Sequence, residues 1–218
     1  MITSTVENYL KALFLLDQHR EKEITTGELA KSLAVTPGSA TSMIKTLAEL
    51  GLIDHRPHYG VRLTDRGRTL AVRVVRRHRI VELFLVEILG MDWSQVHDEA
   101  EKLEHVVSDD VIERMDELLE HPAFDPHGDP IPREDGTLPD RSHYSLSESK
   151  TGQQLSISRM NDQDANFLLF AEKHGLTIGA IIKIIDRNEQ ADSLSIKTNS
   201  DTVVLGLSAA KNIEVCDA

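Results

Sequence analysis

The chain has 218 residues, 40% hydrophobic and 28% charged, which is enough for two domains with ordinary cores. It has no apolar run of roughly 18 residues, and its N-terminus has neither the basic start nor the cleavage site of a signal peptide. With one cysteine and no disulfide framework, these features predict a cytoplasmic protein with no membrane partner. The net charge of −12 is uneven, because residues 1–80 carry 13 Lys and Arg against 8 Asp and Glu, and the remainder carries 11 against 28. This asymmetry suggests a basic binding module joined to an acidic part.

The N-terminal part predicts three helices followed by a β-hairpin. Apolar residues recur at helical spacing in three segments, residues 4–18, 25–35 and 36–50. Thr36 is expected to cap the third helix, with Pro37 in its first turn and Gly51 ending it. Two short extended segments flank the sequence RPHYG and predict a hairpin with a basic tip.

Three helices and a hairpin follow the plan of a winged helix-turn-helix, in which the second helix of the pair enters the major groove of DNA. Small hydroxyl residues at the start of that helix permit close approach to base edges, and basic residues provide phosphate contacts. The predicted DNA-contacting residues are Thr36, Pro37, Gly38, Ser39, Thr41, Ser42, Lys45, Arg56, His58 and Arg62. The alternative is a helical protein-interaction module of the same topology, but the basic balance and the hairpin favour double-stranded DNA.

The rest of the chain predicts further helices and then a small β-barrel. The helices are expected from Thr64 to about Leu89, from Asp92 to about Val107 and from Asp109 to about Glu120. Five of the seven prolines lie in residues 121–152, which indicates a linker or an extended wrapping segment. Alternating or apolar runs follow, at residues 153–160, 180–187, 193–198 and 202–207, interrupted by one helix at about 162–174.

The predicted fold is therefore mainly α with small β parts. Its predicted domains are a winged helix-turn-helix at residues 1–70, a helical metal-binding and dimerisation domain at 71–140, a linker at 141–152 and an SH3-like β-barrel at 153–218.

The segment VHDEAEKLEHVVSDD, residues 96–110, indicates a metal site. On a helix, four of its side chains lie within a stripe of roughly 100°, namely His97, Glu101, Glu104 and His105. His78 and Glu82 stand four residues apart on the preceding helix. One such pair is typical of a solvated surface, but two sets on consecutive helices after a DNA-binding module favour metal binding.

Several segments resemble the diphtheria-toxin-repressor family, whose members are metal-dependent repressors of iron or manganese uptake. These segments are VENYLKAL, LAKSLAVTPGSATSMIKTLAELGLI, LTDRGRTLA, RRHRIVELFL and VHDEAEKLEHVVSDDVIERM. The resemblance covers nearly the whole chain and is strongest over residues 5–120. The C-terminal barrel is similar to the SH3-like (FeoA-type) domain of the longer members.

The resemblance implies two metal sites. The primary site would use Asn8, Glu101, Glu104 and His105. The second would use His78, Glu82 and His97, and the segments DPHG and NDQD would add Asp125, His127 and an acidic residue at Asp162 or Asp164. A proline-flanked turn is the structural alternative for DPHG.

At two positions this chain departs from the family pattern. The manganese branch has Asp, and the iron branch Met, where this chain has Asn8. A further manganese subgroup has Glu where this chain has Lys11, so the resemblance does not predict a closely spaced two-metal site.

The expected ligands are oxygen and nitrogen atoms without thiolate, which suit Mn²⁺ or Fe²⁺, although other divalent transition metals are expected to bind in vitro. The resemblance implies a metal-activated homodimeric repressor, not an enzyme, that binds palindromic operators of metal-uptake and homeostasis genes. One alternative is a winged-helix regulator that senses an organic ligand. Another is a metal-dependent hydrolase, but the chain lacks a His-Glu-x-x-His motif, a nucleophile elbow and a glycine-rich phosphate loop.

Overall fold

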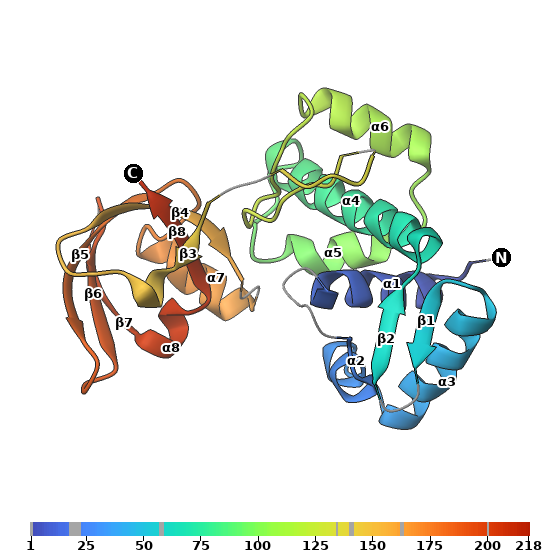
Figure 1. The fold of residues 1–218 in the computed structure, drawn as a ribbon. Helices are drawn as coiled ribbons and strands as arrows, with labels where there is room; N and C mark the ends of the chain where they lie inside the picture. Colours follow the sequence, from blue (N-terminus) through green and yellow to red (C-terminus); the bar gives the residue numbers. More distant parts are fainter. Residues whose placement is uncertain are drawn as a thin grey trace. The chain divides into compact units, whose positions relative to one another are not determined.

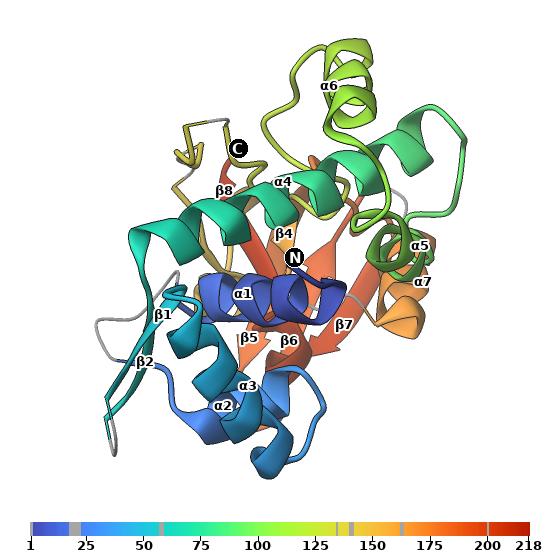
Figure 2. The ribbon, with the colours of Figure 1, turned by 90° about the vertical axis from the view of Figure 1, so that its right-hand side faces the viewer.

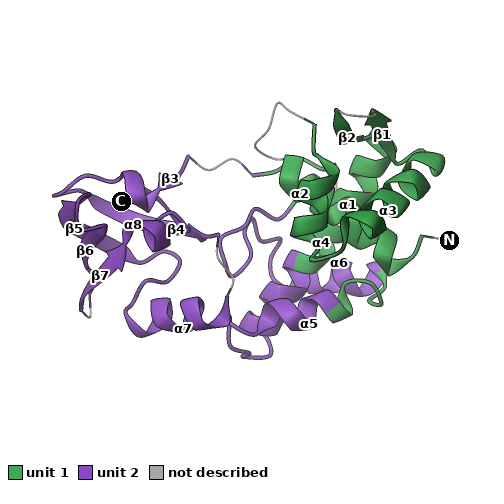
Figure 3. Ribbon diagram, turned by 90° about the horizontal axis from the view of Figure 1, so that it is seen from below, with its two compact units in different colours: residues 1–78, 102–108, 132–138 green, residues 79–101, 109–131, 139–218 purple. Residues whose placement is uncertain are grey.

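The structure is a computed structural model that describes residues 2–17, 23–56, 59–133, 135–139, 142–161, 164–199 and 201–218. The chain divides into two compact units, coloured separately in Figure 3. Unit 1 consists of residues 1–78, 102–108 and 132–138, and unit 2 of residues 79–101, 109–131 and 139–218.

Unit 1 contains the predicted three helices and hairpin (Figure 1). Its elements are α1 (Ser4–Asp17), α2 (Thr26–Ser32), α3 (Pro37–Glu49), β1 (Ile53–Arg56) and β2 (Gly60–Leu63). Thr36 caps α3 as predicted, since its hydroxyl accepts a hydrogen bond of 3.1 Å from the amide of Ser39. The two strands pair antiparallel, with Ile53 opposite Leu63. The winged helix-turn-helix prediction is confirmed.

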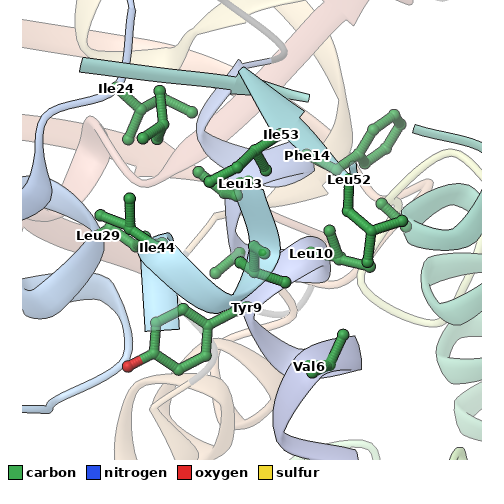
Figure 4. Packing of buried hydrophobic residues seen from close by; sticks show 14 of the residues in the cluster. Val6, Tyr9, Leu10, Leu13, Phe14, Ile24, Leu29, Ile44, Leu52 and Ile53 are labelled. Carbon is green, nitrogen blue, oxygen red and sulfur yellow. The ribbon is translucent and has the colours of Figure 1, made fainter. Parts of the chain in front are cut away.

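The core of unit 1 forms around the apolar face of α1 (Figure 4). Leu10 and Leu13 of α1 are completely buried, as is Leu29 of α2. Helix α3 contributes Ile44 and Leu47, which lie on the face opposite its exposed hydroxyl residues. The core therefore fixes which side of α3 faces solvent.

Helix α4 (Asp65–Glu87) begins where it was predicted to begin, because the hydroxyl of Thr64 accepts a hydrogen bond of 3.1 Å from the amide of Gly67. The division between the units falls within α4, after His78. Helix α5 (Val96–Leu103) is shorter than the predicted segment, whereas α6 (Asp109–Leu118) lies close to its predicted place. The β-branched Val106 and Val107 disfavour continuation of α5.

Unit 2 contains a six-stranded antiparallel sheet in the order β3-β8-β4-β5-β6-β7. Figure 2 labels its strands β4 to β8. The strands are β3 (Tyr144–Ser145), β4 (Gln154–Met160), β5 (Ile181–Asn188), β6 (Ser193–Lys197), β7 (Thr202–Gly206) and β8 (Ile213–Asp217). Strands β4 to β7 confirm four predicted segments, whereas β3 and β8 were not predicted. Helices α7 (Ala165–Lys173) and α8 (Leu207–Ala210) complete this part.

The part of the proline-rich segment around His127 packs against strand β4 in unit 2. The amide of Met160 in β4 donates to the carbonyl of His127 at 2.8 Å. A 3-10 turn, Leu146–Glu148, buries Leu146 completely in the core of the sheet. Residues predicted to be a linker therefore contribute a strand and a core residue. No described helix is long and apolar enough to cross a membrane.

Candidate metal centres and DNA interface

The buried carboxylate of Glu104 lies at the centre of a polar cluster in unit 1. Glu104 follows the last turn of α5 and is completely buried. Its two oxygens each accept a hydrogen bond of 2.8 Å from Nζ of Lys11, and Oε2 lies 2.5 Å from Nδ1 of His78. Burial alone would raise the pKa of Glu104, but the hydrogen bond to His78 and the charge of Lys11 outweigh burial and lower the pKa. Glu104 is thus held as an anion.

His105 is oriented as metal-binding histidines commonly are. Its Nδ1 lies 2.6 Å from Oε2 of Glu7, and its Nε2 lies 3.2 Å from Oε1 of Glu104. A carboxylate accepts hydrogen bonds, so Nδ1 donates to Glu7, whereas Nε2 is buried without a hydrogen bond in the described structure. A carboxylate behind the imidazole fixes the tautomer of ligating histidines in the same way. The spacing of Glu7 did not predict this role, because its partner lies 98 residues away.

Asn8 has a buried side-chain oxygen, Oδ1, without a hydrogen-bond partner in the described structure. An unsatisfied buried amide oxygen is costly unless it binds a ligand or water, so Asn8 suits a neutral metal ligand. Glu101 belongs to unit 2, apart from Asn8, Glu104 and His105, and its membership of the primary site stays a prediction.

A second cluster, in unit 2, consists of Glu82, Asp125 and His127, and all three are buried. One potential ligand atom from each lies within 4.8 Å of the others. Nε2 of His127 lies 3.0 Å from the carbonyl oxygen of Trp93, which can only accept, so Nε2 carries the proton. The remaining nitrogen, Nδ1, is buried without a hydrogen-bond partner, as is Oδ2 of Asp125. The donor set and the unsatisfied atoms fit a divalent transition metal.

The electrostatics of Asp125 also fit a cation-binding site. Burial raises the pKa of Asp125 well above its ordinary value, and the negative charges of Asp129 and Glu82 raise it further. The positive charge of Arg79, whose Nε is 3.7 Å from Oδ2 of Asp125, lowers this pKa but does not offset the effects of burial and of the neighbouring carboxylates. A bound cation would favour the ionised carboxylate.

The loop that carries Asp125 and His127 is fixed to strand β4. Oδ1 of Asp125 accepts hydrogen bonds of 2.9 Å from the amides of His127 and Asp129. Asp129 in turn pairs with Arg159 of β4 at 2.6 Å. Gly128 has φ of +84°, and a Cβ there would lie 2.1 Å from the carbonyl oxygen of Ser158 in β4. The C-terminal sheet therefore positions the two candidate ligands.

Among the other predicted ligands of the second site, His97 contacts this cluster in the described structure. Nδ1 of His97 lies 3.1 Å from Oε1 of Glu82, so these two side chains are together in unit 2. His78 belongs to unit 1, and its place in the second site stays a prediction. Asp164 caps α7 by accepting hydrogen bonds from two amides, a structural role. Asp162 lies outside the described residues.

The predicted DNA-contacting residues of α3 form an exposed surface. All of them are exposed, namely Thr36, Pro37, Gly38, Ser39, Thr41, Ser42 and Lys45. In the hairpin, the exposed Arg56 and Arg62 lie 3.6 Å and 3.9 Å from Oε1 of Glu23. His58 lies outside the described residues. The exposed hydroxyl side chains at the start of α3 and the two exposed arginines of the hairpin are suited to base-edge and phosphate contacts.

Three family models match successive parts of the chain. The model described as "Iron dependent repressor, N-terminal DNA binding domain" matches residues 1–61. The model described as "Iron dependent repressor, metal binding and dimerisation domain" matches residues 64–133. The FeoA domain matches residues 144–216. Together they agree with the fold described above.

The chain is also similar to known regulators in sequence and in structure. The chain is 36% identical over 119 residues to an uncharacterized HTH-type transcriptional regulator of Methanocaldococcus jannaschii, covering 55% of this chain and 95% of that protein. It is 32% identical over 131 residues to the iron-dependent repressor IdeR of Mycobacterium tuberculosis, covering 60% of this chain but only 56% of IdeR. The solved structure of a manganese-dependent transcriptional repressor in complex with manganese is 38% identical, with a TM-score of 0.89 over 98% of this chain and 100% of that chain.

Proposed function

The chain belongs to the iron-dependent repressor family, and on this basis we propose that it is a metal-activated homodimeric repressor of metal-uptake and homeostasis genes. Its partner is double-stranded DNA with a palindromic operator, read by α3 of each subunit. It acts in the cytoplasm with Mn²⁺, as in the manganese-bound relative, or with Fe²⁺, as the name of IdeR indicates. These relatives are transcription regulators named for metals, so neither a hydrolase nor an organic-ligand sensor is favoured.

The observation that carries this proposal is the buried group Glu82, Asp125 and His127, with its unsatisfied ligand atoms on Asp125 and His127. His97 adds a fourth donor, a second imidazole nitrogen, beside Glu82. We propose His78, and Asp162 or Asp164, as the remaining ligands of this site. A bound divalent ion supplies the positive charge that this anionic group lacks.

In the primary site, we propose Asn8, Glu104 and His105 as ligands, with Glu101 added from α5. Glu7 orients His105, and the burial of Glu104 keeps water from its carboxylate. Because Asn8 lies on α1, ligand binding there restrains the helix around which the core of the DNA-binding unit is built. Metal and operator then raise each other's affinity by the same factor, typically worth about 1–3 kcal/mol.

The test begins with operator sequences selected from random duplexes by the Mn²⁺-loaded full chain. Binding is then measured by gel shift in chelator and in Mn²⁺, Fe²⁺, Co²⁺ or Zn²⁺. We expect tight binding with Mn²⁺ or Fe²⁺, weak binding in chelator, and weak binding of Glu104→Gln and His127→Ala with either metal. Asp98→Asn is the matched control, because Asp98 is an exposed carboxylate on α5, the helix that carries the predicted ligands His97 and Glu101. Equal DNA binding in chelator and in every metal would refute the proposal.

A further inference from the structure

Lys11 places a positive charge at the carboxylate of Glu104. Its side chain is only 10% exposed, and Nζ donates to both oxygens of Glu104 at 2.8 Å. Nζ also lies 3.5 Å from Nδ1 of His78. The ammonium group is therefore bound at the most buried carboxylate of the primary site.

An ammonium group and a metal ion require the same oxygen atoms. A divalent metal binds a carboxylate oxygen at about 2.0–2.2 Å, closer than any hydrogen bond. Both oxygens of Glu104 already accept hydrogen bonds from Lys11. A cation bound to either oxygen would be repelled by the ammonium charge, which is poorly screened in a buried site.

In the metal-free protein, by contrast, removing the ammonium group of Lys11 from Glu104 destabilises the fold. A completely buried carboxylate without a counter-charge is strongly destabilising. The ion pair therefore stabilises the state without metal, and the same contact opposes the state with metal.

We infer that Lys11 is a resident cation of the primary site, which neutralises Glu104 in the metal-free protein and must withdraw from it when a metal ion binds. Lys11 thereby raises the metal concentration at which the protein is activated. This inference rests on the proposed function, because it concerns the same primary site.

The test compares three full-length chains, each with His127→Ala to remove the second site: the parent, Lys11→Met and Lys11→Arg. Lys11→Met keeps the length of the side chain without its charge, and Lys11→Arg keeps the charge. We expect Lys11→Met to bind Mn²⁺ at least tenfold more tightly by competition with a fluorescent chelator, and Lys11→Arg to stay within threefold of the parent.

Thermal unfolding provides the second readout. Lys11→Met should melt at a lower temperature than the parent in chelator, and saturating Mn²⁺ should remove most of that difference. Equal loss in chelator and in Mn²⁺, with unchanged Mn²⁺ affinity, would give Lys11 a purely structural role and overturn the inference. Weaker Mn²⁺ binding by Lys11→Met would also overturn it.

If Lys11→Met does not fold, labelling of the wild-type chain still tests whether Lys11 withdraws from Glu104. Amine labelling followed by mass spectrometry should modify Lys11 several-fold faster with Mn²⁺ than in chelator, with the exposed Lys45 as internal reference. An unchanged rate while Mn²⁺ is bound at Glu104 would refute the withdrawal of Lys11. Failure of the wild-type chain to bind Mn²⁺ at all would instead refute the proposed function, and this inference with it.

Discussion

Replacing Gly128 with Ala should damage the proposed second metal site from a position that provides no ligand. A Cβ at this position would lie 2.1 Å from the carbonyl oxygen of Ser158 and 2.9 Å from Cα of Arg159. Both are backbone atoms of β4, so the loop or the strand must shift. The positive φ costs about 1–2 kcal/mol for a residue with a Cβ, and overpacking against fixed atoms adds about 1–3 kcal/mol.

Gly152→Ala is the matched control. Gly152 has φ of +91° in the same unit, but nothing lies within 4 Å of a Cβ there. Its substitution should cost only the backbone term, about 1–2 kcal/mol. The difference between the two variants in the free energy of unfolding, measured with urea, therefore isolates the close approach of the loop to β4.

The second assay for Gly128→Ala is metal binding. Asp125 and His127 lie within three residues of the substitution, and loss of support around ligands commonly lowers metal affinity about 10–100-fold. We expect a loss of this size for Gly128→Ala in a Glu104→Gln background, and none for Gly152→Ala. If the two variants have equal stability and equal Mn²⁺ affinity, strand β4 does not position the ligand loop.

Three further predictions concern Asp125, Thr36 and Lys45. Because the pKa of Asp125 is raised, its carboxyl group stays protonated to a higher pH in the metal-free folded protein than in the unfolded chain. The stability that this protonated group contributes is lost as the pH rises through the raised pKa. Mn²⁺ binding at the second site should then release a proton and weaken as the pH falls below that pKa, measured by calorimetry in buffers of different ionisation enthalpy and absent in Asp125→Asn. Thr36→Ala should lower the free energy of unfolding by about 1 kcal/mol through loss of the helix cap, whereas the exposed Thr46→Ala should change it by less than about 0.5 kcal/mol. Lys45→Ala should reduce the slope of log K against log salt for DNA binding by about one, and an unchanged slope would place Lys45 away from phosphate.

The sequence predicts the elements whose signals are local. Periodic apolar residues with a capping residue locate α3 and the start of α4. Strand β8 was missed although the buried Ile213 and Val215 alternate with half-buried positions, because this run is short and lies close behind α8. Strand β3 has only two residues and carries no periodicity at all.

The candidate ligands followed from spacing and family resemblance, but the groups that control them did not. Lys11 is 93 residues from Glu104, and Glu7 is 98 residues from His105, so only the folded chain brings these pairs together. Spacing on one helix likewise suggested a single stripe, whereas Glu104 and His105 follow the end of α5. Local sequence patterns indicate which residues can bind a metal. Long-range packing determines the charge state and the orientation of their side chains.

The unsatisfied amide oxygen of Asn8 has an evolutionary consequence. Codons for Asn and Asp differ by one base, so a single nucleotide separates the proposed primary site from one with an additional negative charge. Such a change preserves the shape of the side chain and alters mainly its attraction for a cation. With Asn8 as a ligand of the proposed primary site, one mutation would adjust the metal concentration to which the protein responds, without redesign of the fold.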